Sequence, residues 1–335
     1  MNATPITTPL PVELYLESTN RCNLKCRGCI HFRGHWESAR DISYDQMRRI
    51  TDQLPDLQRV ALHGIGEPLL NRHLPEMIEH LKARNVHVLI NSNGILLDAG
   101  VRRALMDSGL DELRISLDAA TPQGYRRIRG SDQFDRIIGN IQALHTLQTD
   151  RGKTGPAVSL WFLGTRDNIA ELPQLVRLAA DLQIAEIYLQ RLVYFQDDAG
   201  YGVAVAQKSL QASEPRLMDL IQESRILADR LGIGFNASGL CKPEQSIRTA
   251  SDEAKPWRKC YRYQRLMYIT AWGNVLPCCI APFATTDYAS LIMGNVFESP
   301  LAEIWTGEPY TRFRKAHVGP TPPQCCRGCG VLWSL

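Results

Sequence analysis

Six short segments rich in Val, Ile and Leu alternate with segments of helical periodicity, and no other feature of the chain constrains its fold as strongly. The strand-like segments are Val12–Glu17, Arg59–His63, Val86–Asn91, Glu112–Leu117, Val158–Leu163 and Glu186–Leu192. Apolar residues recur at helical spacing over Tyr44–Leu54, Leu74–Asn85, Gly100–Ser108, Phe134–Gln148 and Glu171–Leu182. Ser43 and Asp98 stand where they can cap the first and third of these helices. Continuous apolar strands are typical of parallel sheets that are buried on both faces. The alternation predicts β-α units with right-handed crossovers, in a doubly wound sheet or in a partial barrel.

Three cysteines with the spacing C-x3-C-x2-C follow the first strand-like segment: Cys22, Cys26 and Cys29. In barrels of this class the chemistry lies at the C-terminal ends of the strands, so the placement of the cysteines favours a partial (β/α)6 barrel. Three thiolates so close together suit an iron–sulfur cluster with one iron left open. Zinc is the alternative, with His31 or His35 as a fourth ligand.

The length and composition indicate an intracellular enzyme with two metal sites. A chain of 335 residues exceeds the usual single domain, which predicts one large domain and a smaller one. Of its ten cysteines none lies between Cys29 and Cys241, so we expect two thiolate sites and not scattered disulfides. The formal net charge of +3 gives no argument for nucleic acid or an anionic membrane. We read neither a signal peptide nor a membrane span, and expect a soluble cytoplasmic protein.

Polar residues stand at the ends of the second, third and fourth strand-like segments. The motifs are His63-Gly64-Ile65-Gly66-Glu67-Pro68, Asn91-Ser92-Asn93-Gly94 and Ser116-Leu117-Asp118. Glycine lets the backbone approach a ligand closely, and a carboxylate suits an ammonium group; an ordinary turn is the alternative for the first motif. Arg129 follows, and its guanidinium can bind a carboxylate through two parallel bonds, unless it is a solvated arginine on a helix face.

The cysteine triad and these motifs resemble the radical S-adenosylmethionine (SAM) enzymes along most of the chain. The resemblance implies that Cys22, Cys26 and Cys29 hold a 4Fe–4S cluster whose open iron binds SAM. It implies further SAM-binding residues: Gly66, Glu67, Asn93, Ser116, Asp118 and Arg129. Many relatives carry a large residue just before the third cysteine, whereas this chain has Gly28. The adenine is therefore expected to pack elsewhere, against Phe32 or the segment Gln190–Val193.

The C-terminal region carries a second set of cysteines: Cys260, Cys278, Cys326 and Cys329. With Gly273 they resemble the twitch domain, a shortened SPASM domain, and imply one auxiliary 4Fe–4S cluster held by these four residues. No second auxiliary cluster is expected, and a structural zinc ribbon is the alternative. Cys279 and Cys325 adjoin two of the four, so the register stays open by one residue. A Gly-Asn pair at 273–274 predicts a hairpin of Leu266–Ala271 and Val275–Cys278.

The predicted organisation is a radical SAM core over 1–205, a linker helix over 206–240 and an α+β twitch-like iron–sulfur domain over 241–335. The resemblance implies reductive cleavage of SAM to a 5′-deoxyadenosyl radical, with an electron donor such as flavodoxin or ferredoxin. The radical would abstract hydrogen from a small-molecule or peptide substrate in natural-product or cofactor biosynthesis. One alternative is a different SAM cleavage that forms a carbon–heteroatom bond, such as carbon–arsenic, on a substrate bound to Cys325 and Cys326. Another is a non-catalytic iron–sulfur or zinc module.

Overall fold

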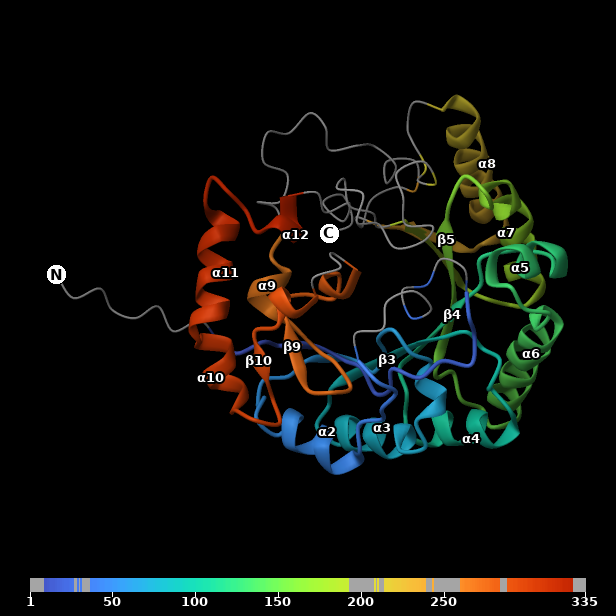
Figure 1. Cartoon of the computed structure of the whole chain (residues 1–335). Helices are drawn as coiled ribbons and strands as arrows, with labels where there is room; N and C mark the ends of the chain where they lie inside the picture. The colour runs from blue at the N-terminus through green and yellow to red at the C-terminus, as the bar shows by residue number, and fades with distance from the viewer. Residues whose placement is uncertain are drawn as a thin grey trace.

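A computed structural model describes residues 9–26, 29, 31, 37–192, 208, 210, 214–238, 243, 260–283 and 288–327. Within these residues the strands form one ten-stranded sheet in the order β10-β9-β8-β1-β2-β3-β4-β5-β6-β7. The sheet is curved, with most of the helices along its outer side (Figure 1). The chain is therefore an α/β protein built on a partial barrel.

The six predicted strands are confirmed, and neighbours in sequence are parallel neighbours in the sheet. Their bounds are Glu13–Leu16 for β1, Arg59–Ala61 for β2, His87–Ser92 for β3, Glu112–Ser116 for β4, Ala157–Gly164 for β5 and Glu186–Arg191 for β6. Burial alternates along β1, β4 and β6. The composition of these strands suggested burial on both faces. They are instead fully buried on one face only, because that face packs under helices while the other lines a cavity.

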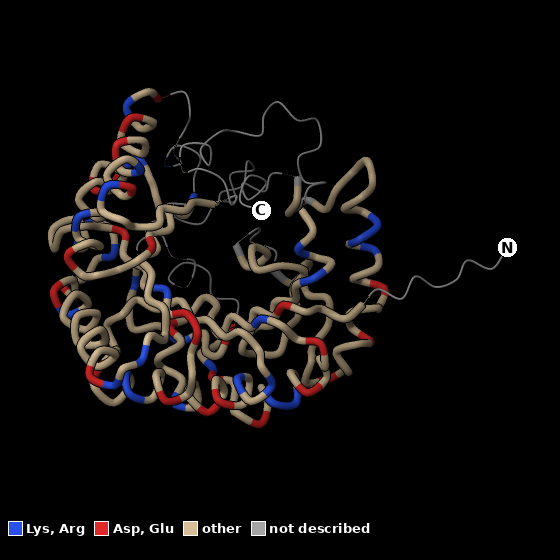
Figure 2. Tube along the Cα trace, turned by 180° about the vertical axis from the view of Figure 1, so that it is seen from behind, with Lys and Arg blue, Asp and Glu red and all other residues tan. Residues whose placement is uncertain are grey.

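Helices connect the strands and cover the outer face of the sheet (Figure 1). They are α2 (Tyr44–Thr51), α3 (Leu74–Lys82), α4 (Ala99–Asp107), α5 (Pro122–Arg129), α6 (Phe134–Asp150) and α7 (Leu172–Asp181), with the short 3-10 helices η1 (Pro68–Leu70) and η2 (Ile169–Glu171). Both predicted caps are confirmed: Ser43 accepts from the Gln46 N–H, and Asp98 accepts from the N–H groups of the first turn of α4. Figure 2 shows Lys and Arg interspersed with Asp and Glu along these outer helices. No helix in the described residues is long and apolar enough to cross a membrane.

A seventh parallel strand, which the sequence analysis did not predict, follows the sixth. Helix α8 (Pro215–Leu231) ends at Gly232, whose φ of +70° is left-handed, and leads to β7 (Gly234–Ala237) beside β6. The segment expected as a linker helix thus contains a helix and a strand of the main sheet.

The C-terminal region extends the opposite edge of the same sheet. Strand β8 (Leu266–Ile269) pairs in parallel with β1, so that Leu14 lies beside Met267. The predicted hairpin is confirmed, because β8 pairs antiparallel with β9 (Asn274–Leu276), with Gly273 in the left-handed region at φ +83°. The remaining elements are β10 (Gly294–Asn295), α9 (Arg262–Arg265), α10 (Leu301–Thr306), α11 (Glu308–Val318), α12 (Gln324–Arg327), η7 (Ala281–Phe283) and η8 (Tyr288–Leu291).

Candidate functional site

The inner face of the curved sheet lines a cavity of about 750 Å³. Its walls come from β1 to β7, from the cysteine loop after β1 and from the region around α9. The interior of a closed (β/α) barrel is filled by branched apolar side chains. Here the inward positions are largely polar or aromatic, so the partial barrel encloses a cavity in place of a packed core.

All three predicted cluster cysteines line this cavity. The Cys29 N–H donates to the Cys26 carbonyl at 3.1 Å, and the Leu24 N–H donates to Cys22 Sγ at 3.5 Å. The pKa of Cys22 is raised to about 11, mainly by burial and to a smaller extent by Glu67 and the other two thiols. In the described residues no three His, Cys, Asp or Glu side chains converge tightly enough to chelate a single metal ion. A cubane cluster does not require such convergence, since each thiolate binds a different iron.

Gly66 packs against the backbone of the cysteine loop. A Cβ at this position would lie 2.3 Å from the Thr19 carbonyl oxygen and 2.6 Å from that of Arg21. The next residue, Glu67, donates its N–H to the same Arg21 oxygen at 2.7 Å. The glycine therefore serves close contact between two loops, in addition to any approach to a ligand.

Glu67 links this turn to the end of β3. Its buried carboxylate accepts from the Ser92 hydroxyl and the Asn93 N–H, both at 2.8 Å, and from the Leu69 N–H at 3.2 Å. Burial raises the pKa of Glu67 to about 7, partly offset by these bonds and by Arg129. Asn93 in turn donates to Asn23 Oδ1 in the cysteine loop at 2.8 Å. The first and second predicted motifs are thus hydrogen-bonded into one unit that lines the cavity.

Asp118 and Arg129 form a buried ion pair, with 2.6 Å between Arg129 Nε and Asp118 Oδ2. Arg129 Nη1 also donates to Cys26 Sγ at 3.8 Å. Burial opposes the charge of Arg129, but Asp118 and Cys26 raise its pKa above the usual value. Ser116 and Arg129 line the cavity, whereas Asp118 is not among the described residues that do so. Asp118 therefore contacts Arg129 and the Leu163 N–H instead of the cavity.

Glu17 is a buried residue behind the site, and the sequence analysis missed it. Its buried carboxylate accepts from the Ile65 N–H at 2.7 Å, from the Ala271 N–H at 3.1 Å and from the Tyr268 hydroxyl at 3.5 Å. Burial raises the pKa of Glu17 to about 7. The residue joins the glycine-rich turn to the hairpin of the C-terminal region. A glutamate at the end of an apolar strand was the available signal.

Three of the described C-terminal cysteines, Cys260, Cys278 and Cys279, act electrostatically on the guanidinium of Arg262. Nη1 of Arg262 donates to Cys279 Sγ at 3.3 Å; burial opposes the Arg262 charge, while Cys279, Tyr15, Cys278 and Cys260 raise its pKa. The Sγ atoms of Cys325 and Cys326 are 3.9 Å apart. Of the described C-terminal cysteines only Cys279 lines the cavity. Cys241 and Cys329 lie outside the described residues.

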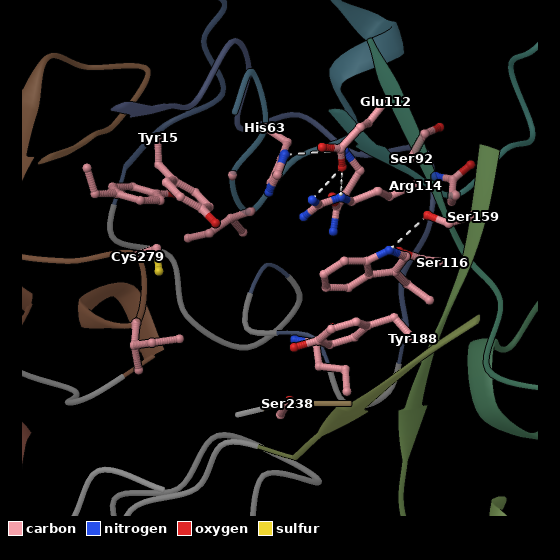
Figure 3. A pocket seen from close by; sticks show the side chains of 18 of the residues that line it. Tyr15, His63, Ser92, Glu112, Arg114, Ser116, Ser159, Tyr188, Ser238 and Cys279 are labelled. Carbon is pink, nitrogen blue, oxygen red and sulfur yellow. Dashed lines mark hydrogen bonds and ion pairs between the residues drawn. The ribbon is translucent and has the colours of Figure 1, made fainter. Parts of the chain in front are cut away.

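A polar and aromatic wall, also missed, comes from β4 to β6 (Figure 3). Glu112 accepts from Arg114 Nε at 2.8 Å, and the Arg114 guanidinium lies 4.4 Å above the Trp161 ring. Trp161 stacks on Tyr188, with 4.0 Å between ring centroids and 12° between planes, and donates to Ser159 Oγ at 3.1 Å. Polar or aromatic residues at every second position of these strands were the available signal.

The residues expected near the adenine are only partly described. Gln190 lines the cavity, whereas Gly28, Phe32 and Val193 lie outside the described residues. The donor set at the cysteine loop fits an iron–sulfur cluster with SAM: three thiols share one cavity with a carboxylate, Glu67, and a cation, Arg129, that contacts one thiol.

Comparison with known proteins identifies both regions of the chain. The family model described as radical SAM superfamily matches residues 16–179, and the SPASM model, described as an iron-sulfur cluster-binding domain, matches residues 260–330. The chain is 26% identical over 328 residues to the tungsten-containing aldehyde ferredoxin oxidoreductase cofactor-modifying protein of Pyrococcus furiosus, covering 93% of this chain and 86% of that one. It is 25% identical over 326 residues to the PqqA peptide cyclase of Xanthomonas axonopodis pv. citri, covering 96% and 80%.

The fold is that of SuiB from Streptococcus suis, solved with S-adenosylmethionine bound. The TM-score is 0.71 at 20% identity, covering 97% of this chain and 72% of SuiB. The two domains imply three kinds of cofactor: SAM, a SAM-binding 4Fe–4S cluster and auxiliary iron–sulfur clusters. The cysteine-lined cavity and both family models agree, and the chain belongs to the radical SAM superfamily as an enzyme with a C-terminal SPASM domain.

Proposed function

We propose that this enzyme abstracts a hydrogen atom from a small-molecule or peptide substrate held in the cavity of the partial barrel. The observation that carries the proposal is that the three thiols, the glycine-rich turn and a polar wall share one cavity. When bound, the cluster and SAM supply reductive cleavage to a 5′-deoxyadenosyl radical, which the protein positions against the substrate. The enclosing sheet limits access of water to the reacting atoms.

Each predicted residue then has a task suited to its contacts. Cys22, Cys26 and Cys29 hold the cluster, and Glu67 faces the SAM amino group while it keeps its bonds to β3. Arg129 binds the SAM carboxylate. Asp118, which does not line the cavity, orients the guanidinium of Arg129 through their ion pair. Gly66, Asn93 and Ser116 complete the SAM contacts from the strand ends.

The C-terminal region would hold one auxiliary 4Fe–4S cluster on Cys260, Cys278, Cys326 and Cys329. When bound, such a cluster would supply an electron acceptor, which favours a net oxidation of the substrate. Proteins similar in sequence carry the names PqqA peptide cyclase and cofactor-modifying protein, which supports a substrate from peptide or cofactor biosynthesis. A flavodoxin or ferredoxin in the cytoplasm would supply the first electron. We also propose that the radical SAM core spans residues 1–205, that residues 206–240 link it to the C-terminal domain, and that this domain spans residues 241–335.

Anaerobic reconstitution tests the proposal. We expect about eight irons and eight sulfides per chain, and reductant-dependent formation of 5′-deoxyadenosine with methionine. Cys26→Ala should lose the cleavage, while Cys325→Ala, a cysteine outside both predicted ligand sets, should retain it. Methylthioadenosine as the product would instead indicate the other SAM cleavage. Reconstituted protein that forms neither nucleoside would refute the proposed reaction.

A further inference from the structure

The turn of the C-terminal hairpin lies against the cysteine loop that follows β1. Trp272 Nε1 in this turn donates to the Ser38 carbonyl at 2.8 Å, across 234 positions of sequence. Ser38 belongs to the segment 37–41, which returns beside the start of the cysteine loop. The same Ser38 carbonyl accepts from Asn20 Nδ2, also at 2.8 Å, and Asn20 stands just before Arg21 and Cys22. One backbone oxygen thus joins the hairpin to the segment that carries the cluster cysteines.

Asn20 is held by both ends of its side-chain amide. Its Oδ1 accepts from the Arg40 N–H at 2.7 Å, while its Nδ2 makes the bond to Ser38. The guanidinium of Arg40 lies 4.5 Å from the centroid of the Trp272 ring, as a cation–π contact. We call this set the hairpin clamp: Asn20, Ser38, Arg40 and Trp272. Its four members form a closed ring of contacts, so a displacement of Trp272 acts on Asn20 through both Ser38 and Arg40.

The turn that carries Trp272 is fixed by its own hydrogen bonds. The Gly273 N–H donates to the Thr270 carbonyl, and the Thr270 N–H donates to the Asn274 carbonyl, both at 2.9 Å. The Thr270 hydroxyl donates to Glu37 Oε1 at 2.9 Å, which adds a second bond between the turn and the segment 37–41. The hairpin therefore supports the cysteine loop from a firmly bonded turn.

The clamp adjoins the place where the cysteine loop contacts the glycine-rich turn. Arg21 follows Asn20, and its carbonyl accepts the Glu67 N–H at 2.7 Å. The Arg21 guanidinium pairs with Asp41 at 2.6 Å, so it is tied to the segment 37–41 as well. Glu67 and Cys22 both line the cavity. A displacement of Asn20 therefore moves Arg21 relative to Glu67, and Cys22 moves with it.

We propose that Trp272 is a positioning residue for SAM binding, because the hairpin clamp holds the cysteine loop in the place where Cys22 and Glu67 form the SAM site. The inference deepens the proposed function, since it takes these two residues to belong to that site. It gives the C-terminal domain a task besides holding iron–sulfur. The hairpin of this domain completes the support of the SAM site in the radical SAM core.

Equilibrium dialysis of SAM against the reconstituted enzyme, without reductant, tests the inference. Trp272→Phe removes the N–H that binds Ser38 and keeps an aromatic ring beside Arg40. We expect this variant to raise the SAM dissociation constant about fivefold, the change that corresponds to one hydrogen bond. Asn20→Ala should also weaken SAM binding. The double variant should bind SAM no more weakly than Asn20→Ala, because both single changes break the same connection.

Trp305→Phe is the matched control. Trp305 Nε1 also donates to a backbone carbonyl at 2.8 Å, that of Pro9, and the Arg314 guanidinium lies 4.2 Å from the centroid of the Trp305 ring. The change thus removes the same kind of bond from the same domain. Pro9 precedes β1 and is not part of the cysteine loop. Trp305→Phe should therefore lower the free energy of unfolding but leave SAM binding unchanged.

Two further measurements separate positioning from a general loss of stability. Amide hydrogen exchange over residues 19–22 should be faster in Trp272→Phe than in wild type and unchanged in Trp305→Phe, and it needs no SAM. Electron paramagnetic resonance of the reduced, SAM-bound enzyme should show a shifted signal of the SAM cluster in Trp272→Phe. The iron content of that variant should stay at the wild-type value, since no proposed cluster ligand is changed.

SAM binding by Trp272→Phe at wild-type affinity would overturn the inference, and so would an equal loss of SAM affinity in Trp305→Phe. These outcomes differ from a failure of the proposed function. If wild type forms 5′-deoxyadenosine and Trp272→Phe binds SAM normally, only the positioning role is refuted. If wild type forms methylthioadenosine and the variants bind SAM as expected, only the proposed hydrogen abstraction is refuted.

Discussion

Gly66→Ala is expected to destabilise the protein because the added methyl group has no space. Its Cβ would lie 2.3 Å from the Thr19 oxygen and 2.6 Å from the Arg21 oxygen, and both atoms belong to the backbone of the cysteine loop. Backbone atoms cannot rotate away, so the two loops must separate, at a cost of about 1–3 kcal/mol. The separation also stretches the 2.7 Å bond from the Glu67 N–H to Arg21, which contributes about 1 kcal/mol. The free energy of unfolding should fall by about 2–4 kcal/mol.

Equilibrium urea unfolding measures this loss, with an unchanged m-value as the condition for comparing midpoints. Gly139→Ala is the matched control, because Gly139 lies in the middle of α6 and nothing lies within 4 Å of its added Cβ. That variant should gain about 0.5–1 kcal/mol from the greater helix propensity of alanine. If Gly66→Ala unfolds at the wild-type midpoint or above it, the two loops are not in the close contact described.

Three further outcomes are expected. Asp118→Asn leaves the buried guanidinium of Arg129 without its anionic partner, so it should lower the free energy of unfolding in urea by about 3–5 kcal/mol. The same variant should weaken SAM binding measured by calorimetry, and an unchanged SAM affinity would exclude an orienting role for Asp118. Burial raises the pKa of Glu17 from its usual 4.5 to about 7, so its stabilisation is full below pH 4.5 and is lost as the pH rises through about 7. Glu17→Gln should therefore flatten the dependence of unfolding free energy on pH over this range, and an equally steep slope would contradict the assignment. Cys278→Ala should lose about four irons per chain, while Cys279→Ala should keep them; the reverse result would shift the ligand register by one residue.

The main sheet could be predicted because its periodicity is local. Continuous apolar strands and amphipathic helices appear in windows of about ten residues, and the two caps depend on single side chains. Strand β7 could not be found in this way, because its four residues, Gly-Phe-Asn-Ala, are too few to show a period and follow closely after a helix. The partner of β8 could not be found either, since pairing with β1 depends on contacts far apart in the sequence.

The same difference between local and long-range signals applies to the candidate site. The spacing of the cysteines and the glycine-glutamate-proline motif are local signals, and the structure brings them to one cavity. Glu17 contacts a residue 254 positions along the chain, and Asp118 at the end of β4 pairs with Arg129 at the end of α5, so the tasks of these residues emerge only from the fold. The sequence indicated that Gly66 lets the backbone approach a ligand, whereas the atoms closest to its added Cβ belong to the backbone of the cysteine loop.

The parallel pairing of β1 with β8 affects how the chain is made. Leu14 and Met267 are neighbours in the sheet but are separated by about 250 residues of synthesis. At 5–20 residues per second, the ribosome needs roughly 10–50 s to reach β8 after β1 has emerged. During that interval the edge of β1 has no partner from β8, and an open strand edge can pair with other chains. Nascent chains of this enzyme should therefore depend on chaperones that shield strand edges until translation is almost complete.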